Sequence, residues 1–256
     1  MLARAGSAAF WAFIAVTSAL LYPVAVLLWL VTAPFDRHRR LLHRFTCAWA
    51  SLYTRVNPLW LVEVRGRERI RRGETYVMVA NHASLLDILV LFRLSTHFTW
   101  VSKAENFRVP FIGWNMRLNG YVPLRRGDRA SVAAMMAACE RSLRDGESVM
   151  LFPEGTRSRD GGLGAFRTGA FELAQRTGRP VLPVAVSGTA DALPRRGFVL
   201  RGRHRITVEV LEPVPPSSWE GLSARGLAER TRDVLAASLR SRAAEGSVER
   251  GADAGV

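Results

Sequence analysis

The chain has 256 residues, enough for one α/β domain with a buried core and one additional element. Its formal net charge of +14 comes almost wholly from arginine, because Lys103 is the only lysine among 36 basic residues, and it predicts an anionic partner such as a membrane surface or a phosphorylated substrate. Nucleic acid is excluded as that partner because the sequence contains no zinc-finger, homeodomain or RNP pattern.

The amino-terminal segment is predicted to be associated with a membrane. Residues 5–35 carry no charge, and as a straight helix they would be about 46 Å long, more than the ~30 Å hydrocarbon core of a bilayer. Pro23 should kink this helix, so a tilted span and a bent, re-entrant hairpin are both open. Arginines gather directly after the segment, whereas only Arg4 precedes it, and the positive-inside rule then places the body of the protein on the cytoplasmic face of the inner or plasma membrane.

The next stretch, 37–56, is predicted to be an amphipathic helix. One apolar face carries Leu41, Phe45, Ala48, Leu52 and Val56, widened by Trp49 and Tyr53. Another face carries Arg40, Arg44, Ser51 and Arg55. This period near 3.6 suits a helix that lies in the headgroup region of a bilayer, and equally a helix that packs on the rest of the protein.

From residue 60 onward, short apolar runs alternate with helical stretches. The predicted strands are 61–64, 76–80, 98–102, 121–124, 148–152, 181–187 and 206–211. The predicted helices are 85–94, 128–144, 169–177 and 222–242. Several of the strand-like runs are apolar throughout, which is typical of strands covered on both faces. The sequence therefore predicts an α/β fold with a mixed, largely parallel sheet flanked by helices.

These elements divide the chain into three parts. Residues 1–59 form the membrane-associated helical segment, and residues 60–242 form the α/β domain. Residues 243–256 are small, polar and glycine-containing, and we expect them to be disordered. Cys47 and Cys139 lie in no metal-binding or CxxC spacing, so we expect two buried thiols in a reducing compartment.

The first candidate site follows the strand-like run that ends at residue 80, where Asn-His-Ala-Ser-Leu-Leu-Asp occupies 81–87. His82 would lie at the carboxyl end of a strand, where α/β sheets place their functional groups. A neutral imidazole can accept a proton, and Asp87 can orient it and stabilise the imidazolium. Because no Gly-x-Ser-x-Gly elbow or suitably placed cysteine supplies a nucleophile, the pair predicts direct attack by a substrate hydroxyl. The alternative is a structural histidine capped by Asp87; a metal site lacks further ligands.

Two further motifs also follow strand-like runs. Phe-Pro-Glu-Gly-Thr-Arg-Ser at 152–158 combines a glycine, which permits close backbone approach, with two hydroxyls and the phosphate-matching guanidinium of Arg157. Gly-Tyr-Val-Pro-Leu-Arg-Arg at 120–126 brings Arg125 and Arg126 to a strand end. The alternatives are a solvated turn with an ion pair for the first motif and exposed arginines in an arginine-rich protein for the second.

In this order the motifs resemble the glycerolipid acyltransferase family that includes the 1-acylglycerol-3-phosphate acyltransferases. The family's four blocks are Asn-His-x-x-x-x-Asp, Gly-x-x-x-x-x-Arg, Phe-Pro-Glu-Gly-Thr-Arg-Ser and a Val-x-Pro strand. They are matched here by residues 81–87, 120–126, 152–158 and 181–183. Lys103 and the stretches 110–113 and 166–170 are also family-like. Arg125 and Arg167 depart from the pattern, since relatives often carry an acidic or neutral residue at the first position and lysine at the second.

The resemblance implies acyl transfer to the free hydroxyl of 1-acylglycerol-3-phosphate, which makes phosphatidic acid. His82 would be the general base and Asp87 would orient it, while the acyl donor would be a thioester of coenzyme A or acyl carrier protein. The residues implied to hold the acceptor's glycerol-phosphate end are Arg126, Glu154, Gly155, Thr156 and Arg157. Pro183 belongs to the strand implied to line the donor site, and no metal or redox cofactor is required.

The expected partners are a membrane-borne lipid acceptor, the acyl donor and an anionic membrane surface. Three alternatives are open. The same chemistry could act on another lysophospholipid or an amino-acid lipid, water could replace the acceptor in a thioesterase, or a non-catalytic protein could merely bind anionic lipid. The intact pair of His82 and Asp87 counts against the last of these.

Overall fold

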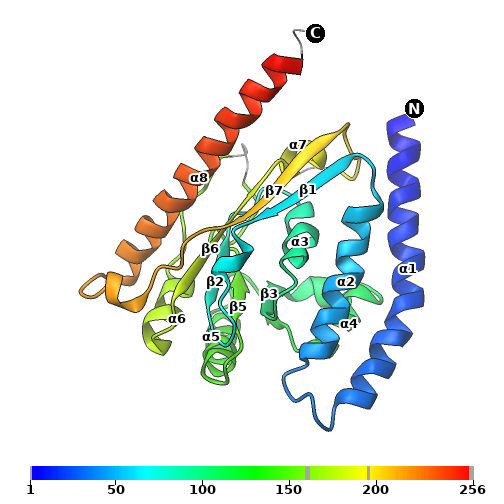
Figure 1. Ribbon diagram of the computed structural model, residues 1–256. Coiled ribbons are helices and arrows are strands. Elements are labelled where there is room, and N and C mark those ends of the chain that lie inside the picture. The colour runs from blue at the N-terminus through cyan, green and yellow to red at the C-terminus, as the bar shows by residue number, and fades with distance from the viewer. Residues whose placement is uncertain (1, 159–161, 195–196, 254–256) are drawn as a thin grey trace.

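The computed structural model describes residues 2–158, 162–194 and 197–253. Figure 1 shows a twisted central sheet with helices on both faces, and two long helices side by side at one flank. In sheet order β1-β7-β6-β2-β5-β3-β4, each strand pairs with its neighbours. The strand bounds are β1 Trp60–Arg65, β2 Val77–Ala80, β3 Thr99–Lys103, β4 Val122–Leu124, β5 Val149–Leu151, β6 Val181–Ser187 and β7 His204–Val210.

The sheet is mixed and largely parallel, as the sequence predicts. The one antiparallel pairing is that of β6 with β7, and every other neighbouring pair described is parallel. All seven predicted strands form, each within two residues of its predicted bounds. The central strand β2 is buried along its whole length, which explains why its sequence is apolar throughout.

Helices cover both faces of the sheet (Figure 1). The sheet thereby separates the hydrophobic core into two layers. One layer lies under α2 Arg40–Val56 and α3 Leu86–Leu91, which a 3₁₀ turn continues to Leu94. The other lies under α5 Arg129–Arg144, α6 Gly169–Thr177 and α8 Ala224–Asp253. Two short helices were not predicted: α4 Ile112–Leu118 and α7 Thr189–Ala192.

The amino-terminal segment forms α1, Leu2–Thr32, a single helix that contains Pro23. The bent hairpin is therefore not formed within this segment. By length and composition α1 could cross a membrane, and only 17% of its most apolar 18-residue window is buried. Its covered side packs on α2 and α4. The hydroxyl of Tyr53 on α2 bonds to the hydroxyls of Thr17 and Ser18 at 2.9 and 3.2 Å, which satisfies polar groups inside the interface.

Helix α2 is buried only partly along the apolar face predicted. Trp49 and Tyr53, at one edge of that face, are buried together with Leu42 and Thr46, whereas Leu41 and Val56 remain 41% and 48% exposed. Periodicity defines which residues share a face, but the packing of α2 against α1, α3 and β1 decides which of them are covered. The apolar face between the arginines of α2 is left outward, so the packed helix keeps the amphipathic surface that suits a headgroup region.

The carboxyl-terminal helix is longer than predicted, because α8 continues to Asp253 where disorder was expected from residue 243. The segment 242–245 reads Arg-Ala-Ala-Glu, all good helix formers, so the helix can propagate past the end of the apolar pattern. Disorder was predicted for residues 243–256 from their low hydrophobicity, without regard to the helix propensity of this segment. Residues 254–256 lie outside the described part of the chain.

Candidate active site

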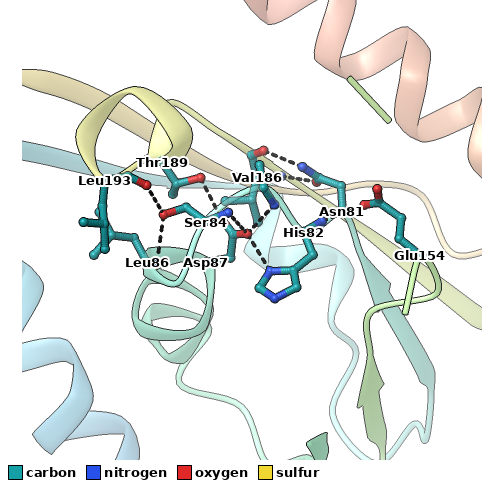
Figure 2. A network of polar contacts seen from close by, with 10 residues as sticks. Asn81, His82, Ser84, Leu86, Asp87, Glu154, Val186, Thr189 and Leu193 are labelled. Carbon is teal, nitrogen blue, oxygen red and sulfur yellow. Dashed lines mark hydrogen bonds and ion pairs between the residues drawn. The ribbon is translucent and has the colours of Figure 1, made fainter. Parts of the chain in front are cut away.

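The loop that follows β2 presents His82 directly beside Asp87 (Figure 2). Asn81 fixes the start of this loop, because its side-chain amide donates to the carbonyl oxygen of Val186 and accepts from its N–H, both at 2.8 Å. The Nδ1 atom of His82 lies 2.9 Å from Oδ2 of Asp87. A carboxylate can only accept a hydrogen bond, so Nδ1 carries the proton and Nε2 keeps its lone pair. The imidazole is thus held in the tautomer that a general base requires.

The carboxylate of Asp87 is completely buried and is held by four donors. Its Oδ2 atom accepts from Nδ1 of His82 and from the backbone N–H groups of Ala83 and Ser84, at 2.7 and 2.8 Å. Its Oδ1 atom accepts from the hydroxyl of Thr189 at 2.5 Å. A buried charge is costly unless hydrogen bonds replace its water, and these donors do so. They also fix the carboxylate plane against the imidazole.

Thr189 is the positioning residue that the sequence did not reveal. It follows β6 at the first turn of α7, 102 residues from Asp87 in the chain, and is 1% exposed. Ser84 adds a second tie to this helix by donating from its hydroxyl to the carbonyl oxygen of Leu193 at 2.6 Å. Because β6 neighbours β2, the carboxyl end of β6 could have been predicted to contribute to the site. No motif spacing in the sequence, however, singles out this threonine.

Glu154, predicted to hold substrate, supports the backbone of the site instead. Its Oε1 atom accepts from the N–H of His82 at 2.8 Å, and its Oε2 atom accepts from the N–H of Gly164 at 3.0 Å. Burial raises the pKa of this carboxyl, and the two backbone N–H groups partly offset the effect. The N–H of Ser158 donates to the carbonyl oxygen of His82 at 2.8 Å. The loop after β5 therefore hydrogen-bonds to both the backbone N–H and the backbone carbonyl of His82.

The imidazole of His82 also stacks on an aromatic ring. Its ring centroid lies 4.0 Å from that of Phe152, with an interplanar angle of 12°. Phe152 in turn lies 5.4 Å from Trp100 on β3. Stacking restricts rotation of the imidazole about its bond to the backbone, so the ring is fixed by Asp87 at one edge and by Phe152 at one face.

A pocket of about 290 Å³, here called the acceptor pocket, is lined by Phe152, the ring that stacks on His82, although His82 itself does not line it. Its cationic lining residues are Lys103, Arg126 and Arg167, and Glu172 is its acidic lining residue among the residues described. Burial, and then the charge of Arg167, lower the pKa of Arg126; the charge of Glu105 raises it and that of Arg157 lowers it. Three cationic side chains against one carboxylate around this pocket favour an anion.

The predicted acceptor-binding residues do not all reach this pocket. Arg126 and Gly155 line it, whereas Glu154, Thr156 and Arg157 do not. Gly155 has a φ of +70°, and a Cβ atom there would lie 2.7 Å from Nε of Arg167, so the turn requires glycine to bring the backbone under that guanidinium. Arg167 also lines this pocket, although it was not among the predicted acceptor-binding residues and departs from the lysine common in the family.

Residues 61–187 match the family described as Acyltransferase. A 1-acyl-sn-glycerol-3-phosphate acyltransferase of Chlamydomonas reinhardtii is 34% identical over 93% of this chain and 71% of its own length. The chain belongs to this acyltransferase family. Chloroplastic 1-acyl-sn-glycerol-3-phosphate acyltransferases of Brassica napus and Arabidopsis thaliana are each 36% identical over 80% of the chain, which spans only 58% and 56% of their lengths.

The fold of this acyltransferase is shared with a solved structure. The crystal structure of PlsC, the 1-acyl-sn-glycerophosphate acyltransferase from Thermotoga maritima, superposes with a TM-score of 0.76 over 94% of this chain and 98% of the other, at 23% identity. In residues 2–158, 162–194 and 197–253, no group of three or more metal-binding side chains is placed to hold an ion. Both cysteines are buried and free, and burial raises the pKa of each thiol to about 12, so neither is poised as a nucleophile.

Proposed function

We propose that this acyltransferase moves an acyl group from a thioester to the free hydroxyl of 1-acylglycerol-3-phosphate, making phosphatidic acid. The observation that carries the proposal is the oriented pair of His82 and Asp87 beside the basic acceptor pocket. The relatives' names support the choice of acceptor, since the three relatives described above are all 1-acyl-sn-glycerol-3-phosphate acyltransferases. Arg126 and Arg167 would face the phosphate of such an acceptor.

The geometry suggests how the chain would perform this reaction. Nε2 of His82 takes the proton of the acceptor hydroxyl as the oxygen attacks the thioester carbonyl carbon. The tetrahedral intermediate then collapses, the carbon–sulfur bond breaks, and the imidazolium returns its proton to the thiolate that leaves. Asp87 stabilises the positive charge on His82 between these two proton transfers. No protein nucleophile takes part, and the proton taken in the first step balances that returned in the second.

We also propose that the protein acts at a membrane, on its cytoplasmic face. Both a lysolipid acceptor and a diacyl product reside in a bilayer, and α1 offers an apolar surface of the required length. Residues 37, 39, 40 and 44, at the end of α1 and the start of α2, are arginines that would face anionic headgroups. The donor thioester that we propose is one of coenzyme A or of acyl carrier protein.

The test is an acceptor panel with a labelled acyl thioester and the purified full-length protein. We expect 1-acylglycerol-3-phosphate to be acylated at least about tenfold faster than monoacylglycerol or lysophosphatidylcholine, because hydrogen bonds to a charged phosphate contribute roughly 1.5–3 kcal/mol each. His82→Ala should lower turnover about 10²–10⁴-fold. Arg126→Gln should lower kcat/KM for the acceptor, and Arg126→Lys should restore little of it because a point charge lacks the planar fork.

The panel separates the alternatives. Arg141→Gln, on the outer side of α5, removes an equal charge away from the pocket and should leave the rates unchanged. Release of free labelled fatty acid without any acceptor would identify a thioesterase. Equal rates on all three lipids would reject the phosphate monoester as the recognised group, and near-normal turnover by His82→Ala would reject the mechanism.

A further inference from the structure

A second and larger pocket, of about 530 Å³, lies beside the edge strand β4. Successive residues around this strand divide between the two pockets. Pro123 and Arg125 line the second pocket, whereas Leu124 and Arg126 line the acceptor pocket. Pro123 and Leu124 lie on opposite faces of the strand, as successive strand residues do, and the division continues to Arg125 and Arg126, which follow the strand directly. The volume is within the ~300–1,000 Å³ range of small-molecule pockets.

The second pocket carries more cationic than anionic lining groups. Arg108, Arg117 and Arg125 line it, and Glu105 is its acidic lining residue. Glu105 lies 3.3 Å from Nζ of Lys103, whose charge offsets its own. Within the described ranges, none of the three arginines forms a salt bridge with a carboxylate, and Nε of Arg117 donates to the carbonyl oxygen of Phe107 at 3.2 Å, which aims its guanidinium. Arg108 also acts on Glu105 through its charge. Three exposed guanidinium groups around one hollow, against one carboxylate, give it a positive potential that favours an anion.

The wall of this pocket leads onto an apolar, aromatic surface. Helix α4, which contributes Arg117, leaves Ile112 and Trp114 40% and 41% exposed. The ring of Trp114 packs at 5.5 Å on Tyr22 of α1, the helix whose outer side is exposed and apolar. Tryptophan and tyrosine gather where hydrocarbon meets headgroups, and arginine forks match phosphate geometry. Here both features occur around one pocket.

We propose that the second pocket binds the phosphate headgroup of an anionic bilayer phospholipid, whose acyl chains lie along the exposed surface of α4 and α1. A soluble anion would need the three arginines but not the apolar surface beside them. A lipid uses both, and it would fix the height and rotation of the domain at the bilayer so that the acceptor pocket faces its substrate. The inference rests on the proposed membrane location, not on the identity of the acyl acceptor.

The test measures lipid binding by the full-length protein in neutral detergent micelles, without any acyl donor. Dioctanoyl phosphatidylglycerol is titrated calorimetrically and compared with dioctanoyl phosphatidylcholine. We expect one saturable site for the anionic lipid and none for the zwitterionic lipid. Replacing Arg108, Arg117 and Arg125 together by Gln should weaken binding at least about tenfold, since each removes charge-assisted hydrogen bonds.

A matched control removes the same total charge elsewhere. Arg72, Arg141 and Arg225, on the loop before β2 and on α5 and α8, are replaced together by Gln, and affinity should stay within about threefold because distant charges are screened by salt. Equal losses of lipid affinity in the two triple variants would show that binding depends only on total charge, and would overturn the proposal. If Arg126→Gln abolished lipid binding and the pocket variant retained it, the lipid would bind in the acceptor pocket, which would also overturn the proposal.

Two further arms identify the source of the anion. Inorganic phosphate should not compete with the lipid at equal concentration, because it lacks the apolar chains. If free coenzyme A competed with the lipid, and the pocket variant no longer bound coenzyme A, the pocket would be a site for the phosphates of the acyl donor and not for a lipid. Because the titration involves no acyl transfer, its outcome is independent of the acceptor panel, so failure of either proposal can be distinguished from failure of the other.

Discussion

The hydroxyl of Thr189 offers a sharp test of how the fold prepares His82. Thr189→Val removes the donor to Oδ1 of Asp87 while keeping nearly the same shape, so no cavity forms. Asp87 is fully buried, so bulk solvent does not replace the donor to Oδ1. The remaining donors, including Nδ1 of His82, all bond to the other carboxylate oxygen. The substitution therefore leaves one oxygen of a buried charge unsatisfied.

The expected magnitude follows from that contact. A hydrogen bond to a charged group contributes about 1.5–3 kcal/mol, and at 2.5 Å between buried partners this one belongs to the stronger kind. We expect the free energy of unfolding to fall by about that amount. The carboxylate keeps its three donors on Oδ2 but loses the one that fixes Oδ1, which loosens the orientation of His82. A misorientation that costs ~1.4 kcal/mol in the transition state lowers kcat about tenfold.

The assay is steady-state kinetics with the acyl thioester and the lysolipid, beside urea unfolding of each variant in the same detergent. We expect kcat to fall while KM for both substrates is unchanged, and Thr189→Ser to recover most of kcat because it restores the hydroxyl. Thr231→Val is the control. Thr231 is also fully buried, and its hydroxyl donates at 2.8 Å to the carbonyl oxygen of Leu227 on α8, away from the site.

The kinetic pattern distinguishes a positioning role from a structural one. If Thr189→Val lost stability but kept full kcat, as we expect for Thr231→Val, its hydroxyl would only support the fold. If Thr189→Ser failed to recover kcat, packing of the methyl group, and not the hydrogen bond to Asp87, would explain the loss.

Further predictions concern the core, the acceptor pocket and the membrane helix. Burial and then the charge of His97 lower the pKa of His43 to about 3, so the unfolded chain takes up a proton there below pH ~6.5 and the folded chain does not. Stability should therefore fall by about 1.4 kcal/mol per pH unit as pH drops from 6.5 toward 4, and His43→Asn should lack that slope in urea unfolding. Gly155→Ala imposes a φ of +70° on a residue with a side chain and crowds Arg167, so it should cost about 1–2 kcal/mol and lower kcat/KM for the acceptor. Leu20→Glu combined with Leu27→Glu, at positions 67% and 62% exposed on α1, should release the protein from membranes under carbonate wash; full retention would contradict burial of this side in lipid.

Sequence pattern alone predicted the strands and the family. Continuous apolar runs predicted all seven strands because strands covered on both faces exclude polar residues. The ordered motifs around His82, Arg126 and Glu154 predicted the acyltransferase family. They also predicted the pairing of His82 with Asp87, since a residue at a strand end and one in the first turn of the following helix can meet by local geometry alone.

Tertiary structure decided whatever depends on contacts between distant segments. Thr189 reaches Asp87 across 102 residues because β6 and β2 are neighbours in the sheet, an order that no local pattern encodes. The covered side of α2 depends on its packing against α1, α3 and β1, so Trp49 and Tyr53 of the predicted apolar face are buried while Leu41 and Val56 are not. Arg125 and Arg126 look equivalent in the sequence, yet they line different pockets, because they follow an edge strand whose two faces meet different surroundings in the folded sheet.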